Sequence, residues 1–457
     1  MTARESDVAV NAADGATAAS APAPGKLLQV LGIAFGLAVL VGNTIGMGIL
    51  RTPGEVAAHV PSVPLFMGVW VAGALYALLG ALTVSELVAM RPRSGGLYPL
   101  VENGLGTFPG FVVGWSDWLA VCGSTAAVAI VLGEYLGPLI PALAGQEKWI
   151  ACTVVLAFGL MQWRGIRIGD VAQQVTSLIK ALALIALALI AFFMTSDSAT
   201  IATTPVVVPP LPVGIGLVAA LIIAMQSAIY TYDGWTGPIY FSEELQDPAR
   251  DAPRTMISGV LLVMAIYLLL NAAFLCVIPI GEMAGDPFVA ATAAARLFGP
   301  LGDTVIRIVM IISLVASVNA LVLIASRVPF ALSRDGLLPA ALQRVNAGGT
   351  PVPALWASIM VALGLIVTNT LNTVVAMLAF MFVANYAVTF FTFFVMRKRQ
   401  PDSPRPFRVP LYPFVPALAL LGSLAFMVAA LISDTTNSLL ALGLVGISWP
   451  VYRAFRR

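Results

Sequence analysis

The sequence has few charged residues, one histidine and three cysteines. Only 10% of its 457 residues are charged, 59% are hydrophobic and the mean hydropathy is +0.94. This composition excludes a soluble chain and predicts an integral membrane protein. His59 alone cannot form a histidine-rich metal site, and Cys122, Cys152 and Cys276 have neither zinc-ligand spacing nor the pattern of a disulfide framework. We therefore expect no cofactor, no metal and no nucleic-acid partner.

Long apolar runs are abundant, and they are continuous rather than alternating. The segment "ALALIALALIAFFM" at 181–194 is an example. Strands of a membrane barrel would alternate apolar and polar residues, so these runs predict helices. The sequence thus predicts an all-α membrane protein with twelve transmembrane helices. The expected spans are 28–58, 65–91, 108–137, 149–163, 170–195, 211–246, 255–280, 301–333, 352–370, 372–396, 411–432 and 435–454.

The distribution of basic residues predicts the orientation. Residues 1–25 are rich in Ala, Ser and Pro and have no apolar core, which indicates a disordered cytoplasmic tail rather than a signal peptide. With that tail inside, most of the 24 Lys and Arg residues fall on the cytoplasmic side, including the run "RKRQPDSPRPFR" at 397–408. We therefore expect a multi-pass protein of the cell membrane with both termini cytoplasmic. The short loops are typical of a bacterial inner membrane protein.

Two of the predicted spans are interrupted by glycine and polar residues. Span 1 contains "GNTIGMG" at 42–48, and span 6 contains "YTYDGWTGP" at 230–238. These spans are the first members of two successive five-span blocks. A pair of interrupted spans at matching positions points to a substrate site near the middle of the bilayer. The alternative is that each interruption is a helix kink accommodated by packing.

Several motifs resemble those of the amino acid–polyamine–organocation (APC) transporters. They are "GNTIGMGILRTPG" (42–54), "SELVAMRPRSGGLYPLVENGLG" (85–106), "SRVPFALSRDGLLPAALQRVNAGGTPVPAL" (326–355) and "RPFRVPLYP" (405–413). The segment "YDGWTGPIYFSEEL" (232–245) is most similar to the L-type amino acid transporter branch. The resemblance implies a LeuT-like five-plus-five inverted repeat with broken helices 1 and 6. The expected units are the tail 1–25, a first repeat at 26–200, a second repeat at 205–398 and two last helices at 399–457.

The interruptions suit a free amino acid, which carries a carboxylate and an ammonium group. The half-helix that starts near Gly48 presents unpaired N–H groups that favour the carboxylate. Gly46 and Gly48 let the ligand approach the backbone closely. Carbonyls before the break favour the ammonium group. The expected substrate-binding residues are Thr44, Ile45, Gly46, Met47, Gly48, Tyr230, Asp233, Gly234 and Trp235.

The resemblance leads to particular expectations for Met47 and Tyr230, and the chemistry of Asp233 allows two. Met47 stands where the family often has a small hydroxyl residue, and we expect this change to alter substrate preference. Tyr230 matches the position of the family's aromatic gate, and the alternative is an ordinary interfacial aromatic residue. Asp233 either pairs with a cationic substrate side chain or caps N–H groups exposed by the break.

Charged residues inside the spans are usually functional. Lys180 lies ten residues after Asp170, or roughly 15 Å along the helix, and therefore inside the membrane. The resemblance implies that a lysine at this position takes the place of a coupling sodium ion, with Ser317 as its partner in span 8. We expect Lys180 to bridge spans 1, 5 and 8; the alternative is a purely structural lysine. Asp117 is either a proton-linked group or a hydrogen-bond partner of a neighbouring helix.

Two carboxylates follow the second interruption. Glu243 and Glu244 end span 6, and we expect them to pair with Arg91, Arg93 or other cytoplasmic basic residues as an inner gate. The alternative is a solvated helix end.

These features together predict a sodium-independent secondary transporter of neutral L-amino acids that works by alternating access. Exchange and proton-coupled uptake both remain open, and Lys180 is the natural titratable group for the latter. The alternatives are a cationic amino acid or polyamine carrier that uses Asp233 and, more distantly, a non-transporting receptor. No metal set or nucleophile–base pair indicates an enzyme. Residues 138–148 contain no cysteine, so no disulfide-linked heavy chain is expected.

Overall fold

The computed structural model describes residues 27, 29–46, 48–137, 139–196, 208–286, 288–368, 371–433 and 435–455. Within these ranges every regular element is helical, so the prediction of an all-α protein is confirmed. The predicted tail 1–25 and Met47 lie outside the described residues. The long elements are α1 (Ile33–Thr44), α2 (Gly48–His59), α3 (Val63–Met90), α5 (Thr107–Leu136), α6 (Glu147–Trp163), α7 (Ile166–Ser196), α8 (Ile215–Thr231), α9 (Pro248–Val277), α12 (Gly302–Ala325), α14 (Val352–Thr368), α15 (Leu371–Arg399), α16 (Phe414–Ser433) and α17 (Thr435–Gly446).

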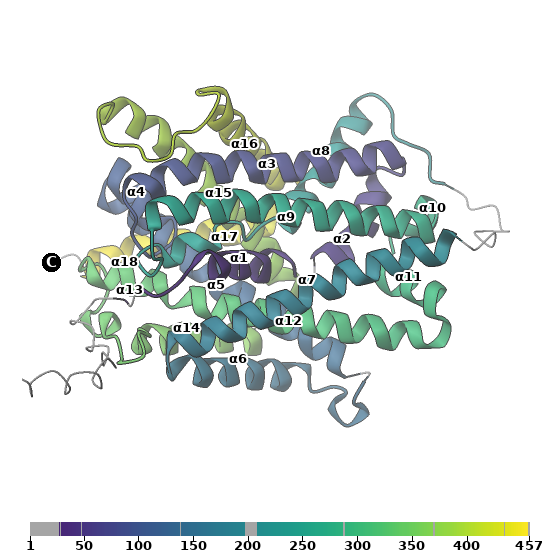
Figure 1. Cartoon of the computed structure of the whole chain (residues 1–457). Coiled ribbons are helices and arrows are strands. Elements are labelled where there is room, and N and C mark those ends of the chain that lie inside the picture. The colour runs from purple at the N-terminus through teal and green to yellow at the C-terminus, as the bar shows by residue number, and fades with distance from the viewer. Residues whose placement is uncertain are drawn as a thin grey trace, which may run out of the picture.

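Short helices lie at the two ends of this bundle. Figure 1 shows most of the long helices running side by side, with α4 (Tyr98–Leu105), α13 (Arg327–Arg334) and α18 (Ser448–Phe455) gathered at the end on the left. We call this end the Arg-rich end, because the last turn of α15, which contains Arg397, Lys398 and Arg399, also lies there. The helices α10 (Ile280–Met283) and α11 (Val289–Phe298) lie at the opposite end.

Eight helical segments of the described chain are long and apolar enough to cross a bilayer. They are Val63–Met90, Thr107–Leu136, Gly169–Met194, Pro248–Val277, Thr304–Arg334, Met377–Arg399, Phe414–Ile432 and Thr435–Phe455. The pair α1 and α2 gives a ninth if it counts as one span, and α8 and α14 are shorter apolar helices. The molecule is therefore a multi-pass membrane protein.

The distribution of side chains on α7 explains how such a helix sits in lipid. Its polar residues Gln173, Ser177 and Lys180 are buried on one face. Large apolar residues are exposed on the opposite face. The exposed stripe consists of Val171, Val175, Leu178 and Leu182. A helix on the surface of a water-soluble protein buries its apolar face and exposes its polar face. Because α7 has the opposite arrangement, lipid covers its apolar face.

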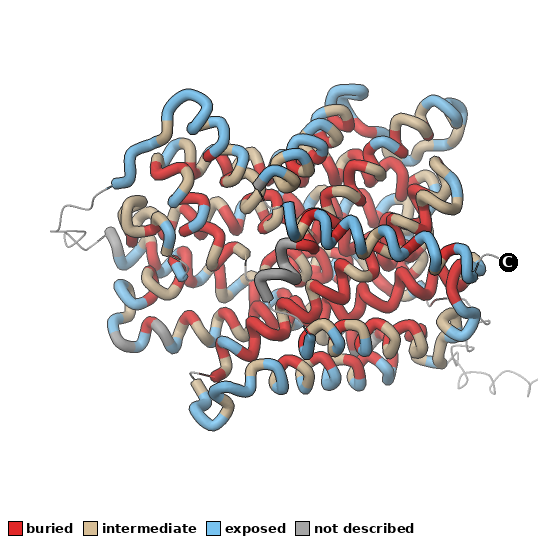
Figure 2. Tube along the Cα trace, turned by 180° about the vertical axis from the view of Figure 1, so that it is seen from behind, coloured by how far each residue is buried: buried red, intermediate tan, exposed pale blue. Residues whose placement is uncertain are grey.

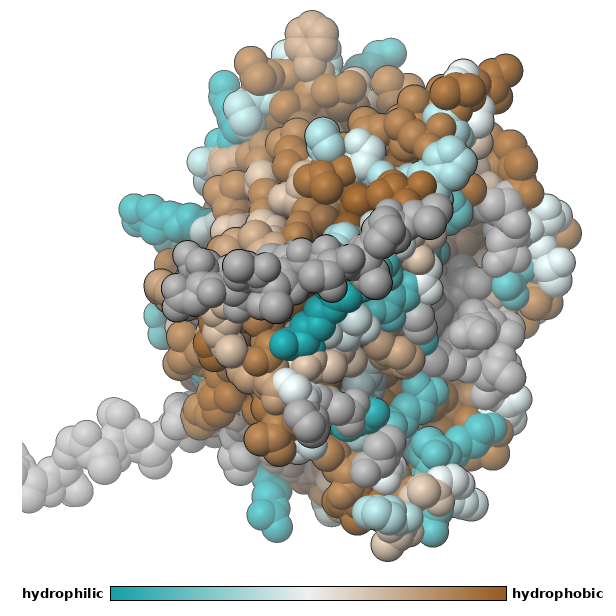
Figure 3. Space-filling model, turned by 90° about the vertical axis from the view of Figure 1, so that its right-hand side faces the viewer, coloured by the Kyte–Doolittle hydropathy of each residue, from teal (hydrophilic) through white to brown (hydrophobic). Residues whose placement is uncertain are grey.

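The remaining long helices surround a buried centre. Helix α1 packs against α7, α9 and α12, while α2 packs against α8 and α5 packs against α12 and α15. Figure 2 shows buried residues concentrated in the middle of the bundle and exposed ones on the outer helices and ends. Seen from the end that carries α10 and α11, hydrophobic side chains dominate the upper rim, and hydrophilic ones gather toward the centre and below (Figure 3).

Two interruptions of the helices meet in this centre. Helix α1 ends at Thr44 and α2 starts at Gly48, and the two axes differ in direction by 46°. Helix α8 ends at Thr231 and is followed by turns and by the 3-10 helix η2 (Gly237–Phe241). Gly234 in this stretch has φ +110°, a conformation that favours glycine.

A short backbone pairing links the outer ends of the same two segments. The Leu31 N–H donates to the Glu244 carbonyl at 2.9 Å, and the Gln246 N–H donates to the Leu31 carbonyl at 2.9 Å. This isolated parallel bridge between Leu31 and Leu245 joins the chain before α1 to the chain after η2.

Candidate functional site

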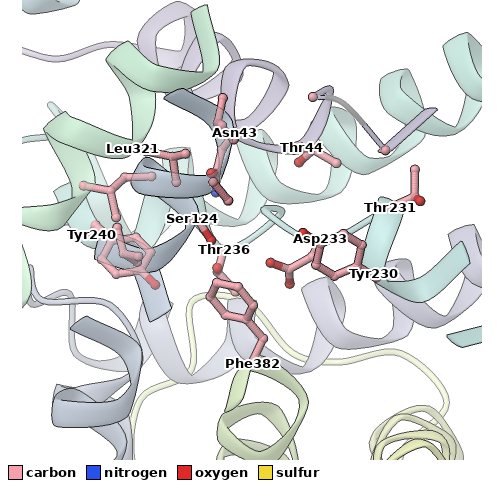
Figure 4. Close-up of a pocket in the computed structure, with 16 residues that line it drawn as sticks. Asn43, Thr44, Ser124, Tyr230, Thr231, Asp233, Thr236, Tyr240, Leu321 and Phe382 are labelled. Atoms are coloured by element: carbon pink, nitrogen blue, oxygen red, sulfur yellow. The ribbon is translucent and has the colours of Figure 1, made fainter. Parts of the chain in front are cut away.

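A cavity lies where the two interruptions meet. Its volume is about 70 Å³, which is room for several water molecules or a small ligand, since one water needs roughly 15 Å³. Figure 4 shows side chains from several helices pointing into it. The residues that line it are Asn43, Thr44, Gly46, Gly48, Val121, Ser124, Ala127, Val128, Tyr230, Thr231, Asp233, Thr236, Tyr240, Leu321, Ile324 and Phe382.

Backbone of the first interruption forms one wall of the cavity. Gly46 and Gly48 both line it, and Gly48 is where α2 begins. A Cβ atom on Gly48 would lie 3.0 Å from the side chain and 3.3 Å from the backbone of Thr231, so the two interruptions are in direct contact here. The first N–H groups of a helix have no partner within that helix. This wall therefore suits an anionic group such as a carboxylate.

The second interruption is tied to the first by a side-chain amide. Asn43 Nδ2 donates to the Gly234 carbonyl at 3.1 Å. A Cβ atom on Gly234 would lie 2.9 Å from the Thr44 backbone nitrogen, so glycine is needed for close approach as well as for its φ angle. The two interruptions therefore form one packed unit.

Two carbonyls at the end of α1 already accept hydrogen bonds from side chains. The Tyr267 hydroxyl donates to the Thr44 carbonyl at 2.9 Å. Ser317 Oγ donates to the Ile45 carbonyl at 3.2 Å, and Ser313 Oγ does so at 3.4 Å. The Thr44 carbonyl keeps a second lone pair and can accept one more donor, whereas both lone pairs of the Ile45 carbonyl are used by the two serines.

Lys180 lies against the same break from the side of α7. Its ammonium group donates to the Gly42 carbonyl at 3.1 Å and to Ser317 Oγ at 2.9 Å. The side chain is fully buried. Because Ser317 in turn donates to Ile45, the lysine, α12 and the end of α1 form one hydrogen-bonded chain.

A buried polar cluster continues along α7 from this lysine. Gln173 Nε2 and Ser177 Oγ both donate to the Ala38 carbonyl, at 3.0 and 2.7 Å. Asn319 Nδ2 donates to Gln173 Oε1 at 2.7 Å, which connects the cluster to α12. A Cβ atom on Gly42 would lie 1.9 Å from Gln173 Nε2. Gly42 therefore makes room for the amide that reaches α1.

Two carboxylates near the cavity, the buried Asp117 and the partly buried Asp233, each accept a hydrogen bond from a tyrosine. Tyr240 lines the cavity, and its hydroxyl lies 2.8 Å and 2.9 Å from the two carboxylate oxygens of Asp117. Asp233, which lines the cavity itself, accepts from the Tyr386 hydroxyl at 2.5 Å. A hydrogen bond to a neighbouring element, one of the two interpretations of Asp117, is thus present in the structure.

Ion pairs join the helices at the Arg-rich end. Glu243 accepts two hydrogen bonds from Arg334 at 2.6 and 2.7 Å. Glu244 and Arg327 form a buried two-bond pair at 3.1 Å each. The expected pairing of these glutamates with basic residues is confirmed, and the partners are Arg334 and Arg327 and neither Arg91 nor Arg93.

The reason is that both arginines have other partners. Arg93 is held by Asp335 at 2.7 Å and by Glu102 at 3.4 Å, while Arg91 donates to Asn103 at 2.5 Å. Burial, followed by the negative charge of Asp335, raises the pKa of Glu102 above its usual value.

Some of the predicted site residues lie elsewhere. Ile45, Gly234 and Trp235 do not line the cavity, and the Trp235 ring packs on Tyr386 with centroids 4.9 Å apart. The polar lining residues that sequence reasoning missed are Asn43, Ser124, Thr231, Thr236 and Tyr240. All but Ser124 lie within or beside the interruptions, which was the available signal. Ser124 lies inside α5 with no local signal.

Known proteins resemble this chain over most of its length. A family model described as amino acid permease matches residues 26–449. The serine/threonine exchanger SteT of Bacillus subtilis (strain 168) is 31% identical over 444 residues, which cover 94% of this chain and 98% of that protein.

Two mouse proteins are similar over most of their length. The b(0,+)-type amino acid transporter 1 of Mus musculus is 27% identical over 417 residues, covering 90% of this chain and 84% of its own. The large neutral amino acids transporter small subunit 2 of Mus musculus is 29% identical over 440 residues, covering 93% and 81%. The chain therefore belongs to the amino acid permease family, and it is a multi-pass membrane transporter rather than an enzyme.

Proposed function

We propose that the chain is a sodium-independent secondary transporter of neutral L-amino acids that works by alternating access. One observation supports this most strongly. Two helix interruptions far apart in the sequence line a single cavity in the middle of the bundle, and a buried lysine is bonded to the first of them. Paired interruptions of this kind are typical of transporter sites for small charged substrates.

The proposed substrates are small and polar. The cavity is small, and its lining includes the hydroxyl groups of Ser124, Thr231 and Thr236. These groups can hydrogen-bond to a substrate hydroxyl as donors or acceptors. The similar protein SteT is named a serine/threonine exchanger. Serine and threonine are therefore the first substrates to test.

The proposed binding mode uses the main chain for the amino acid backbone. The N–H groups at the start of α2 would receive the carboxylate, with Gly46 and Gly48 allowing close contact. The Thr44 carbonyl, through its second lone pair, and the carbonyls of Tyr230 and Asp233 would receive the ammonium group. Tyr230 lines the cavity and would cover the ligand as a gate.

The proposed role of Lys180 is to replace a coupling sodium ion. Its Nζ lies between the Gly42 carbonyl and Ser317 Oγ, where the protonated side chain would supply a positive charge to α1 and α12. We propose exchange as the transport mode, on the strength of the similarity to SteT. Proton coupling through Lys180 or Asp117 is the competing mode.

The proposed architecture has twelve spans arranged as a LeuT-like five-plus-five inverted repeat. Helices α6, α8 and α14 have 17 residues each and would complete the set of spans, with α1 plus α2 as span 1 and α8 plus η2 as span 6. The repeats would cover 26–200 and 205–398, followed by two helices at 399–457. We propose a bacterial inner membrane location in a lipid bilayer, cytoplasmic termini and no disulfide-linked heavy chain.

Transport by purified protein in liposomes tests the proposal. Labelled serine, threonine, leucine and lysine would be offered with and without sodium, with and without internal amino acid, and under an imposed pH gradient. We expect uptake of serine or threonine without sodium and stimulation by internal amino acid. Stimulation by an acidic exterior alone would indicate proton symport instead, and a requirement for sodium would contradict the proposal.

A lysine variant tests the role of the buried charge. Lys180→Ala should lower uptake by roughly tenfold or more, because the end of α1 loses its charged partner. Lys148→Ala is the matched control, since that ammonium group donates to the Val367 carbonyl at an exposed position. Equal uptake in the two variants would show that Lys180 is only structural.

A cationic amino acid or polyamine carrier is the second candidate. The observation that favours it is that the Asp233 carboxylate lines the cavity. Strong competition by lysine or arginine that is lost in Asp233→Asn would support this reading. Substrate binding without flux would instead indicate a receptor.

A further inference from the structure

A second groove lies on the outside of the bundle at the Arg-rich end. It has a volume of about 740 Å³ and runs between the outer face of the first turns of α9 and the loop that precedes α16. From α9 it is lined by Arg250, Arg254 and Leu261, and from the loop by Pro406 and Phe407. None of these residues belongs to the central cavity.

The loop wall of the groove is held in place by a buried carboxylate. Glu86, near the end of α3, accepts from Arg405 Nε at 3.0 Å and from the Val409 N–H at 2.8 Å. It also pairs with Arg397 at the end of α15 at 2.7 Å. The two bonds at Arg405 and Val409 flank residues 406–408, so the groove is a preformed feature.

The charges of the groove lie at its mouth. Arg250 and Arg254 are one helical turn apart, both are exposed, and within the described chain neither guanidinium forms a side-chain hydrogen bond or ion pair. Asp247 lines the same region and carries the opposite charge. The groove therefore has two cationic groups and one anionic group, which favours a ligand with a single negative charge.

The apolar part of the groove lies deeper in the same direction along α9. Ser258 and Leu261 are two and three turns beyond Arg250, or roughly 16 Å along the axis at Leu261. Leu261 is 47% exposed, in a helix that is apolar enough to span the bilayer. Along α9 the cationic groups Arg250 and Arg254 therefore come first, and the lining continues past them through Ile257 and Ser258 to Leu261. A phospholipid has the same polarity, with a charged phosphate at one end and acyl chains beyond it.

We propose that this groove binds one anionic phospholipid, with its phosphate on Arg250 and Arg254 and an acyl chain along Leu261 and Phe407. Basic pockets at the membrane surface recognise anionic headgroups by charge, and the apolar continuation selects a lipid over a free anion. The site is separate from the transport cavity, so this proposal goes beyond the proposed function and does not depend on it.

Lipid binding by delipidated full-length protein in detergent tests the proposal. Affinities for phosphatidylglycerol, phosphatidylethanolamine and phosphatidylcholine would be measured by native mass spectrometry, with inorganic phosphate as a competitor. Wild-type protein should prefer phosphatidylglycerol. The double variant Arg250→Gln/Arg254→Gln should lose about thirtyfold in this affinity, because each basic residue near a membrane surface contributes about 1 kcal/mol.

The matched control is Arg164→Gln/Arg344→Gln, which removes the same charge from exposed positions outside the groove. It should keep the wild-type affinity for phosphatidylglycerol. Equal loss in both double variants would overturn the proposal, as would equal binding of phosphatidylcholine and phosphatidylglycerol by wild type. Full competition by millimolar inorganic phosphate would show a site for a small anion instead of a lipid. Unchanged circular dichroism and lipid-free thermal stability would confirm that the variants fold.

Discussion

Two neighbouring carboxylates at the Arg-rich end allow the effect of burial on an ion pair to be measured within one protein. The Glu244 and Arg327 side chains are 0% and 1% exposed, whereas those of Glu243 and Arg334 are 25% and 23% exposed. Both pairs have two hydrogen bonds of ordinary length. They therefore differ mainly in their access to water.

Glu244→Ala should be strongly destabilising. The Arg327 guanidinium would stay buried, with hydrogen bonds to the Leu323 carbonyl and Ser326 Oγ and a position 4.8 Å from the centre of the Phe241 ring, but without an anion. Removing one partner of a buried pair costs about 3–5 kcal/mol. Glu243→Ala breaks a partly hydrated pair, for which about 1 kcal/mol is expected.

Unfolding of the purified variants in mixed micelles, followed by circular dichroism, measures this difference. We expect Glu244→Ala to lower the free energy of unfolding several times more than Glu243→Ala does. The double variant Glu244→Leu/Arg327→Met should recover most of the loss, because it leaves no unpaired charge. Equal effects of the two single variants, or no recovery in the double variant, would refute the reasoning.

Three further outcomes are expected. Gly42→Ala should reduce uptake, because its Cβ would lie 1.9 Å from Gln173 Nε2; uptake equal to wild type in liposomes would contradict this. Glu86→Ala should accelerate tryptic cleavage within residues 397–408, because Arg397 and Arg405 lose the carboxylate that they share. Gel analysis of digests taken over time would detect the faster cleavage. Burial and Asp335 raise the pKa of Glu102, so its contribution to stability is lost as pH rises through that raised pKa; thermal unfolding of Glu102→Gln should depend less on pH than that of wild type.

The sequence was sufficient for the family, for the helical class and for the two interruptions that line the central cavity. The motifs around 42–54 and 326–355 indicated the family that the comparison confirms. Hydropathy and resemblance predict that Lys180 and Ser317 lie on different spans and meet, and Lys180 Nζ lies 2.9 Å from Ser317 Oγ in the structure. The role of Lys180 in transport stays a prediction.

Contacts that depend on the relative rotation of helices could not be predicted. Glu243 meets Arg334 and not Arg93, because Asp335 holds Arg93 on the other side of the same helix end. Ser124 reaches the cavity only because its face of α5 turns inward. Sequence spacing tells which residues share a face of one helix, but it does not tell which face of the neighbouring helix they meet.

The backbone bridge between Leu31 and Leu245 has a consequence for motion. Its two hydrogen bonds join the chain before α1 to the chain after η2. The Glu244 carbonyl accepts one of these bonds, and the Glu244 side chain forms the buried ion pair with Arg327 of α13. A rearrangement that opens the Arg-rich end must either break this junction or carry both segments away together. The amide protons of Leu31 and Gln246 would distinguish these two paths, because their exchange with deuterium would quicken during turnover only if the junction breaks.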